Sequence, residues 1–212
     1  MDIAILIYPR FTALDAVGPY EVLSRLPDAR VRFVAEEVGP KRTDTGQLAL
    51  QADATLDELA HPEIVLVPGG PGQAALMEDG PVHEWLRAAH ETSSWTTSVC
   101  TGSLILAAAG LLTGVRATSH WLALEELGSL GAEPTPERVV FEGKIVTAAG
   151  VSAGIDMALA LAARVAGEDV AQAIQLGIEY DPQPPFDAGS PQKAPARIVD
   201  AVRAHARFEQ VA

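Results

Sequence analysis

The strongest constraint on the fold is a set of short β-branched runs, most of them wholly apolar, that recur along the chain. They span residues 3–7, 31–34, 64–67 and 96–99, and each is bounded by turn residues. Because the runs are not of the alternating kind that marks a half-exposed strand, they are interpreted as strands buried on both faces of a parallel sheet.

Segments with helical spacing lie between these runs. Residues 82–89 carry an apolar stripe, residues 104–112 are so apolar that a helix there must be buried, and residues 152–166 predict a long helix that ends at Gly167. The stretch 138–149 predicts a hairpin around Glu142-Gly143. This alternation predicts an α/β fold in which a doubly wound, mainly parallel sheet is sandwiched by helices, as one domain over residues 1–212.

The C-terminal region has a different pattern. Residues 181–195 contain five prolines in fifteen residues and predict an extended segment, followed by an amphipathic helix over residues 196–208. Tyr180 and Phe186 are apolar anchors beside these prolines. We predict that this segment packs across the protein surface along the interface of a homodimer; the alternative is a flexible connector.

Charge and composition exclude several classes of function. The net charge is −13, with 15 basic residues against 28 acidic ones, which argues against nucleic-acid binding. No apolar run is long enough to span a membrane and no secretion signal is visible, so we expect a cytoplasmic protein with a small-molecule partner. A single cysteine, and histidines without metal-ligand spacing, predict no metal site.

The single cysteine, Cys100, directly follows the predicted strand 96–99, at the sheet edge where open α/β folds bind ligands. Ser98 and Gly102 flank it with the small side chains that a nucleophile elbow requires. A helix beginning near Thr101 is expected to lower the pKa of the thiol through its N-terminal N–H groups. The alternative is a small hydrophobic core residue.

Other strand ends supply candidate partners for Cys100. Asp15 is surrounded by apolar residues, so burial is expected to raise its pKa and suit it to acid catalysis; the alternative is a helix N-cap. Gly69 and Gly70 allow backbone amides to act as oxyanion-type donors to substrate. His120 begins a helix and either contacts substrate or forms structural hydrogen bonds. The remaining histidines are expected to be solvated.

These residues and motifs resemble the ThiJ/PfpI superfamily, whose fold is similar to class I glutamine amidotransferases. The finer pattern resembles the isonitrile (isocyanide) hydratase branch over nearly the whole chain. The segments that show it are FTALDAVGP at 11–19, ATSHW at 117–121, AGVSAGID at 149–156 and EYDPQPPFDAGSP at 179–191.

The resemblance implies that Cys100 is the nucleophile, Asp15 the neighbouring acid and Thr101 a helper at the elbow. It also implies backbone contacts from Gly69 and Gly70, and a dimer. The expected reaction adds water to an isonitrile through a covalent cysteine thioimidate, without metal or organic cofactor. The alternatives are glyoxalase-like or other cysteine-dependent hydrolytic chemistry, and a thiol redox sensor.

Overall fold

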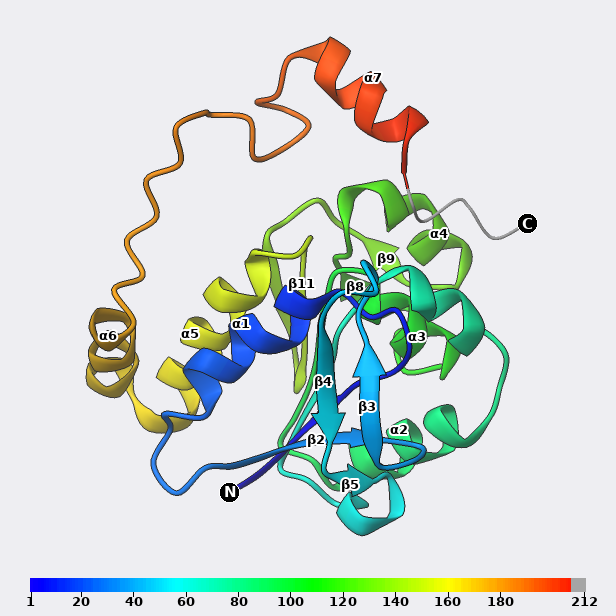
Figure 1. Cartoon of the computed structure of the whole chain (residues 1–212), viewed down its shortest axis with the longest axis vertical. Helices are drawn as coiled ribbons and strands as arrows, with labels where there is room; N and C mark the ends of the chain where they lie inside the picture. Colours follow the sequence, from blue (N-terminus) through cyan, green and yellow to red (C-terminus); the bar gives the residue numbers. More distant parts are fainter. Residues whose placement is uncertain (207–212) are drawn as a thin grey trace.

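The protein is built on a seven-stranded sheet in the computed structural model, which describes residues 1–206. The strand order is β10-β11-β7-β6-β1-β2-β5, and every neighbouring pair is parallel except β10 with β11 (Figure 1). The strands are β1 Asp2–Leu6, β2 Arg30–Ala35, β5 Ala54–Thr55, β6 Ile64–Val67, β7 Trp95–Val99, β10 Val139–Glu142 and β11 Ile145–Ala148.

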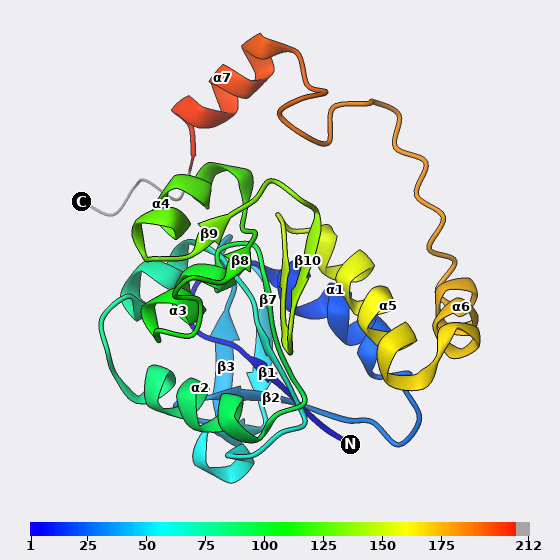
Figure 2. The ribbon, with the colours of Figure 1, turned by 180° about the vertical axis from the view of Figure 1, so that it is seen from behind.

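Helices cover both faces of this sheet (Figure 2). The helices α1 (Ala13–Leu23) and α5 (Ala153–Ala166) pack together on one face, with α6 (Glu168–Gly177) against α5. On the other face lie α2 (Pro81–Thr92), α3 (Gly102–Ala108) and α4 (Leu124–Ser129). Short 3₁₀ helices form at Asp57–Leu59, Pro71–Leu76 and Trp121–Ala123. The doubly wound α/β architecture predicted from the sequence is therefore confirmed.

The central strands are buried on both faces, as their continuous apolarity predicted. All four residues of β6 are fully buried, and so are Thr96, Thr97 and Ser98 of β7. The Thr97 hydroxyl donates to the carbonyl of Val65 at 2.9 Å, so this buried polar group has a partner inside the sheet.

Some boundaries differ from the sequence-based prediction. The buried helix α3 ends at Ala108, because the chain turns at Gly110, whose φ is 82°. The β10–β11 turn is centred on Gly143 and Lys144, one residue later than predicted, since Gly143 takes the positive φ of 57°. The helix α5 does end before Gly167, whose φ is 93°.

Several elements were not predicted from the sequence. These are α6, a hairpin formed by β3 (Gly39–Arg42) and β4 (Ala49–Ala52), and a two-residue pairing of β8 (Arg116–Ala117) with β9 (Glu133–Pro134). Their strands are short and partly exposed, so they lack the continuous apolar signal of the central sheet. None of the helices within residues 1–206 has the length and apolarity that a membrane crossing requires.

The chain changes direction between β1 and β6. From β1 it runs outward to β2 and β5, and it then returns to β6 and continues on the other side through β7 and β11. In open α/β sheets, ligands bind at such a reversal, beyond the carboxyl ends of the strands. The residues that follow β1, β6, β7 and β11 are therefore the first place to look for a site.

An extended arm leaves the body of the protein after α6. Residues 181–195 contain no helix or strand, as predicted, and they lead to α7 (Ala196–Ala204). Residues 181–188 of the arm are exposed and run clear of the body in both views (Figures 1 and 2), and Phe186 among them is 78% exposed. Residues 189–192 return to the body and line a cavity with residues 118–121 and 149–152. The packing of this segment across the protein surface along a dimer interface stays a prediction. The end of the predicted last helix, Phe208, lies outside the described residues.

Candidate active site

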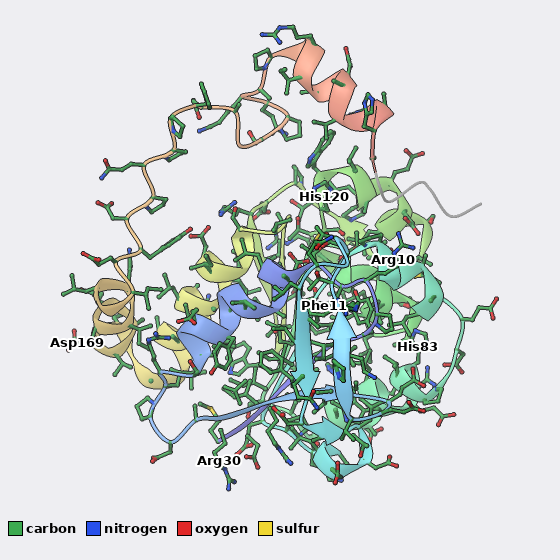
Figure 3. All side chains as sticks on the ribbon, in the orientation of Figure 1. Arg10, Phe11, Arg30, His83, His120 and Asp169 are labelled. Atoms are coloured by element: carbon green, nitrogen blue, oxygen red, sulfur yellow. The ribbon has the colours of Figure 1, made fainter. Side chains whose placement is uncertain are left out.

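Four strand ends bring the candidate residues together at one edge of the sheet. Asp15 follows β1, the Gly69-Gly70 pair follows β6, Cys100 follows β7, and Val151 follows β11. Because these strands are adjacent and parallel, residues far apart in the sequence meet here. Figure 3 shows His120 at this end of the molecule, opposite Arg30 at the amino end of β2.

Cys100 has the strained backbone of a nucleophile elbow. Its φ is 58°, a region that non-glycine residues rarely adopt. Its N–H donates to the carbonyl of Ala148 at 3.0 Å, and its carbonyl accepts from the hydroxyl of Ser119 at 3.0 Å. A Cβ atom at Gly102 would lie 2.0 Å from the carbonyl oxygen of Val67. The close backbone approach predicted for the elbow is therefore confirmed, and the surrounding hydrogen bonds hold the strained turn.

Asp15 is fully buried beside this elbow. One carboxylate oxygen, Oδ2, accepts from the N–H of Gly69 at 3.0 Å. The other, Oδ1, is buried without a hydrogen bond of normal geometry, and the thiol of Cys100 is near enough to lower the pKa of the carboxyl partially. Burial outweighs these contacts and raises the pKa of Asp15 to about 7. Both its protonated and ionised forms are therefore populated near neutral pH.

The N-cap alternative for Asp15 is wrong. Thr12 occupies the N-cap position of α1, and Asp15 is the third helical residue, with its side chain turned to the sheet edge. The buried carboxyl therefore has no capping role that would account for its place in the site.

The expected low pKa of Cys100 is also wrong. Burial raises the pKa of the thiol well above its usual value, and the Coulomb effect of Asp15 raises it further. The N–H groups of Thr101 and Val151 favour the thiolate but only partly offset these effects. Cys100 is fully buried, so in this structure the thiol is neutral near pH 7 and needs a base before it can attack.

Further hydrogen bonds surround Asp15 and Cys100, and they are formed by Gly69, Gly70 and Thr101. The N–H of Gly70 donates to the hydroxyl oxygen of Thr101 at 3.0 Å, while that of Gly69 is bound to Asp15. A Cβ atom at Gly69 would lie 2.4 Å from the nitrogen of Thr101, so only glycine fits there. Both amides are occupied and neither is open to a substrate oxygen, unlike the oxyanion donors expected from the sequence.

We predict that Tyr8, which the sequence interpretation missed, is a positioning residue for the site. It is buried, and its hydroxyl donates to the carbonyl of Pro68 at 2.8 Å, immediately before the two glycines. Its pKa is raised by burial first, and then by the nearby charges of Asp15 and Cys100. Tyr8 follows β1 by two residues, and this position at a strand end of the site is the sequence signal that could have identified it.

We expect Tyr8→Phe to loosen the turn at Pro68 and so weaken the bond from Gly69 to Asp15. That bond lowers the pKa of Asp15, so its loss is expected to move the acid limb of the pH–activity profile upward, with turnover falling about three- to tenfold. Tyr20→Phe is the matched control, because the Tyr20 ring packs on Phe33 at 5.5 Å, away from the turn. An unchanged profile in Tyr8→Phe would contradict the positioning role.

His120 directly follows Ser119, the residue that contacts Cys100, and its side chain is held by contacts with its own segment. Its Nδ1 accepts from the N–H of Leu122 at 3.3 Å, capping the 3₁₀ helix that follows, and its ring lies against Gly150. Burial lowers the pKa of His120 to about 4, so the ring is neutral at pH 7. These contacts favour the structural alternative, and a substrate contact stays a prediction.

Two further expectations concern the other histidines and metals. His83 is 1% exposed on α2, so the expectation that it is solvated is wrong; the helix turns it toward the core beside Val82 and Leu86. Within residues 1–206, no three side chains of the His, Cys, Asp or Glu type are placed to hold a metal ion.

This geometry can be compared with known proteins. The sequence pattern of the DJ-1/PfpI family matches residues 1–164, the region that contains every residue of the site. The chain belongs to the DJ-1/PfpI family. The superfamily expected from the sequence motifs is thereby confirmed, and the similarity to an isonitrile hydratase given next confirms the expected branch.

Relatives within the DJ-1/PfpI family differ in how much of this chain they share. Isonitrile hydratase of Pseudomonas putida is 45% identical over 97% of this chain and 90% of its own length. A solved THiJ/PfpI family protein from Pseudomonas syringae has a TM-score of 0.93 at 39% identity, covering 96% of this chain and 85% of that one. The HTH-type transcriptional regulator CdhR of Pseudomonas aeruginosa is 29% identical over 80% of this chain, which spans only 52% of the regulator.

Proposed function

We propose that this protein is an isonitrile hydratase, which adds water to R–N≡C and releases an N-substituted formamide. The observation on which this rests is the buried pair of Cys100 and Asp15, a neutral thiol beside a carboxyl whose pKa is about 7. The terminal carbon of an isonitrile must receive both a nucleophile and a proton, and this pair supplies both. The 45% identity to the Pseudomonas putida isonitrile hydratase supports the same reaction.

The first step forms a covalent thioimidate. The ionised carboxylate of Asp15 takes the proton of the Cys100 thiol as the sulfur attacks the terminal carbon of R–N≡C. Asp15 then delivers this proton to the same carbon, giving Cys–S–CH=N–R and regenerating the carboxylate. A thiol with a raised pKa suits this step, because its proton stays available until the substrate arrives.

The second step hydrolyses the adduct. Asp15 accepts a proton from water as the oxygen attacks the thioimidate carbon and passes this proton to the nitrogen, giving Cys–S–CH(OH)–NH–R. Collapse of this tetrahedral intermediate breaks the C–S bond and releases R–NH–CHO, while Asp15 transfers the proton of the hydroxyl group to the departing sulfur. Thr101 and the Gly69-Gly70 turn hold Asp15 next to Cys100 in both steps, through the hydrogen bonds that the N–H groups of the two glycines donate to Asp15 and Thr101.

Incubation with a panel of aliphatic and aromatic isonitriles tests the proposal directly. We expect the corresponding formamides to appear, followed by chromatography and mass spectrometry. Methylglyoxal is the comparison substrate, since glyoxalase-like chemistry on the same cysteine would convert it to lactate. Turnover of methylglyoxal with no formamide from any isonitrile would refute the hydratase assignment.

The redox-sensor alternative has less support in this structure. Oxidation to sulfenic acid favours an exposed cysteine of low pKa, whereas Cys100 is fully buried and its pKa is raised. Cys100 is also the only cysteine in the sequence, so the chain has no resolving thiol of its own.

We further propose that a second copy of this chain covers the arm. Leu176 and Phe186 are 79% and 78% exposed, and on α7 Ile198 and Val202 are 39% and 45% exposed. Leu176 and Phe186 in particular have most of their surface exposed, and such apolar side chains gain stability when a partner buries them. A homodimer, with the arm of each chain against the other, satisfies this requirement.

Light scattering coupled to size-exclusion chromatography is expected to show a dimer for the wild type. Phe186→Ala should weaken the dimer at least tenfold, because burying a phenylalanine side chain contributes about 1.5–3 kcal/mol. Gln183→Ala, a polar position on the same arm, is the control and should leave the dimer unchanged. A wild-type monomer of 22.3 kDa would contradict the proposal.

A further inference from the structure

A cavity of about 500 Å³ lies beside the elbow and is not explained by the site described so far. One wall is formed by residues 118–121 and 149–152, and the facing wall by residues 189–192 of the arm and Arg203 of α7. Its volume is in the range of pockets that hold small molecules.

Two residues that line this cavity, Ser119 and Val151, contact the buried Cys100. The hydroxyl of Ser119 donates to the carbonyl of Cys100 at 3.0 Å. The N–H of Val151 favours the Cys100 thiolate. Val151 therefore contacts both the sulfur of Cys100 and this cavity, which places the cavity beside the reacting group, where the R group of a bound substrate could lie.

The charge of the cavity is opposite to that of the protein. The chain has 28 acidic residues and a net charge of −13, yet no Asp or Glu from the described part of the chain lines this cavity. Arg138 and Arg203 line it, together with hydroxyl and amide side chains such as Ser152 and Gln192. A local excess of basic and hydrogen-bonding groups in an acidic protein indicates an anionic ligand.

The two arginines differ in what they offer a ligand. Arg138 is paired with Asp156 and also donates to the hydroxyl of Ser152 at 3.2 Å, so its charge is largely balanced. Arg203 has the ring of Trp121 at 5.5 Å and takes part in none of the ion pairs found within residues 1–206. Arg203 is therefore the cation with spare capacity for a carboxylate.

We propose that this cavity binds the R group of the substrate and that Arg203 recognises a carboxylate on it, so that the preferred substrates are carboxylate-bearing isonitriles. Trp121 supplies a flat apolar surface beside Arg203, which suits an aryl or short alkyl spacer. The substrate class rests on the proposed hydratase function, whereas binding of a carboxylate in the cavity does not.

Protection of Cys100 from alkylation tests the cavity without any turnover. Cys100 is the only cysteine, so mass spectrometry of the iodoacetamide adduct reports on one position. We expect benzoate to slow its labelling more than the neutral isostere benzamide does. Arg203→Met should remove that difference, and Arg197→Met, which removes the same charge from the same helix, should keep it. Equal effects of the two compounds, no protection by either, or identical behaviour of the two variants would each overturn the anion site.

Steady-state kinetics then tests the substrate class. We expect 4-isocyanobenzoate to have a higher kcat/KM than its methyl ester, and Arg203→Met to raise KM for the acid about three- to tenfold while leaving the ester unchanged. A preference for the ester in the wild type overturns the substrate class. If neither compound is hydrated while other isonitriles of the panel are, the substrate class is overturned and the hydratase function stands. If no isonitrile is hydrated, the hydratase function fails, and the benzoate experiment still decides whether the cavity binds an anion.

Discussion

Replacing Cys100 with alanine or serine is expected to abolish formamide production while the fold is retained. The thiol is the only nucleophile of its kind in the chain, and a smaller side chain at the elbow leaves no large cavity. Circular dichroism and thermal unfolding of the variants should match the wild type. Substantial hydration by Cys100→Ala would rule out covalent catalysis.

The pH dependence of Cys100 alkylation follows from the same surroundings. Because burial and Asp15 raise the pKa of the thiol, the rate of reaction with iodoacetamide should still be increasing above pH 9 in the wild type. Asp15→Asn removes the charge that repels the thiolate, so the midpoint should move to lower pH. A midpoint below pH 8.5 in the wild type would show that the hydrogen bonds from the elbow amides affect the pKa of the thiol more than burial does.

Asp15→Asn is expected to lower turnover by about 10²–10⁴-fold, the usual effect of losing a general acid–base group. The asparagine keeps the size of the side chain and an oxygen for the N–H of Gly69, but it cannot carry a proton between sulfur and carbon. In the wild type, activity should rise with pH around the Asp15 pKa of about 7, since the carboxylate form starts the reaction. If Asp15→Asn keeps the wild-type rate, Asp15 does not transfer the proton, and the role passes to bound water or His120.

The same substitution is expected to stabilise the fold. Asp15 has a pKa of about 7 in the folded protein against an ordinary value of 3.8. Its contribution to the free energy of unfolding is therefore fully present below pH 4 and is lost as the pH rises through 7. This shift corresponds to an upper limit of about 4 kcal/mol at pH 8. Urea unfolding should therefore show Asp15→Asn to be more stable than the wild type at pH 8, with the difference vanishing near pH 4. A less stable variant at pH 8 would indicate a structural carboxylate.

The positions of the main elements follow closely from local sequence. Strand β6 begins and ends where its apolar run does, and α2 buries the stripe of Val82, Trp85, Leu86 and Ala89. Helix α6 buries only Ala171 and Ile174, and the strands of the β3–β4 hairpin are short and partly exposed, so neither carries the continuous apolar signal of the central elements. Short exposed strands depend on their neighbours more than on their own residues.

The sequence by itself determined the buried parallel sheet and the elbow at Cys100, and it made Asp15 one candidate partner of the thiol, because these depend on local residue size, apolarity and position after a strand. Only the tertiary structure decided the protonation of the pair, since the pKa of each group depends on burial and on the other group, which is 85 positions away in the chain. It also decided that the amides of Gly69 and Gly70 hold Asp15 and Thr101. The cavity beside the elbow is likewise tertiary, because its two walls come from segments that no local pattern pairs.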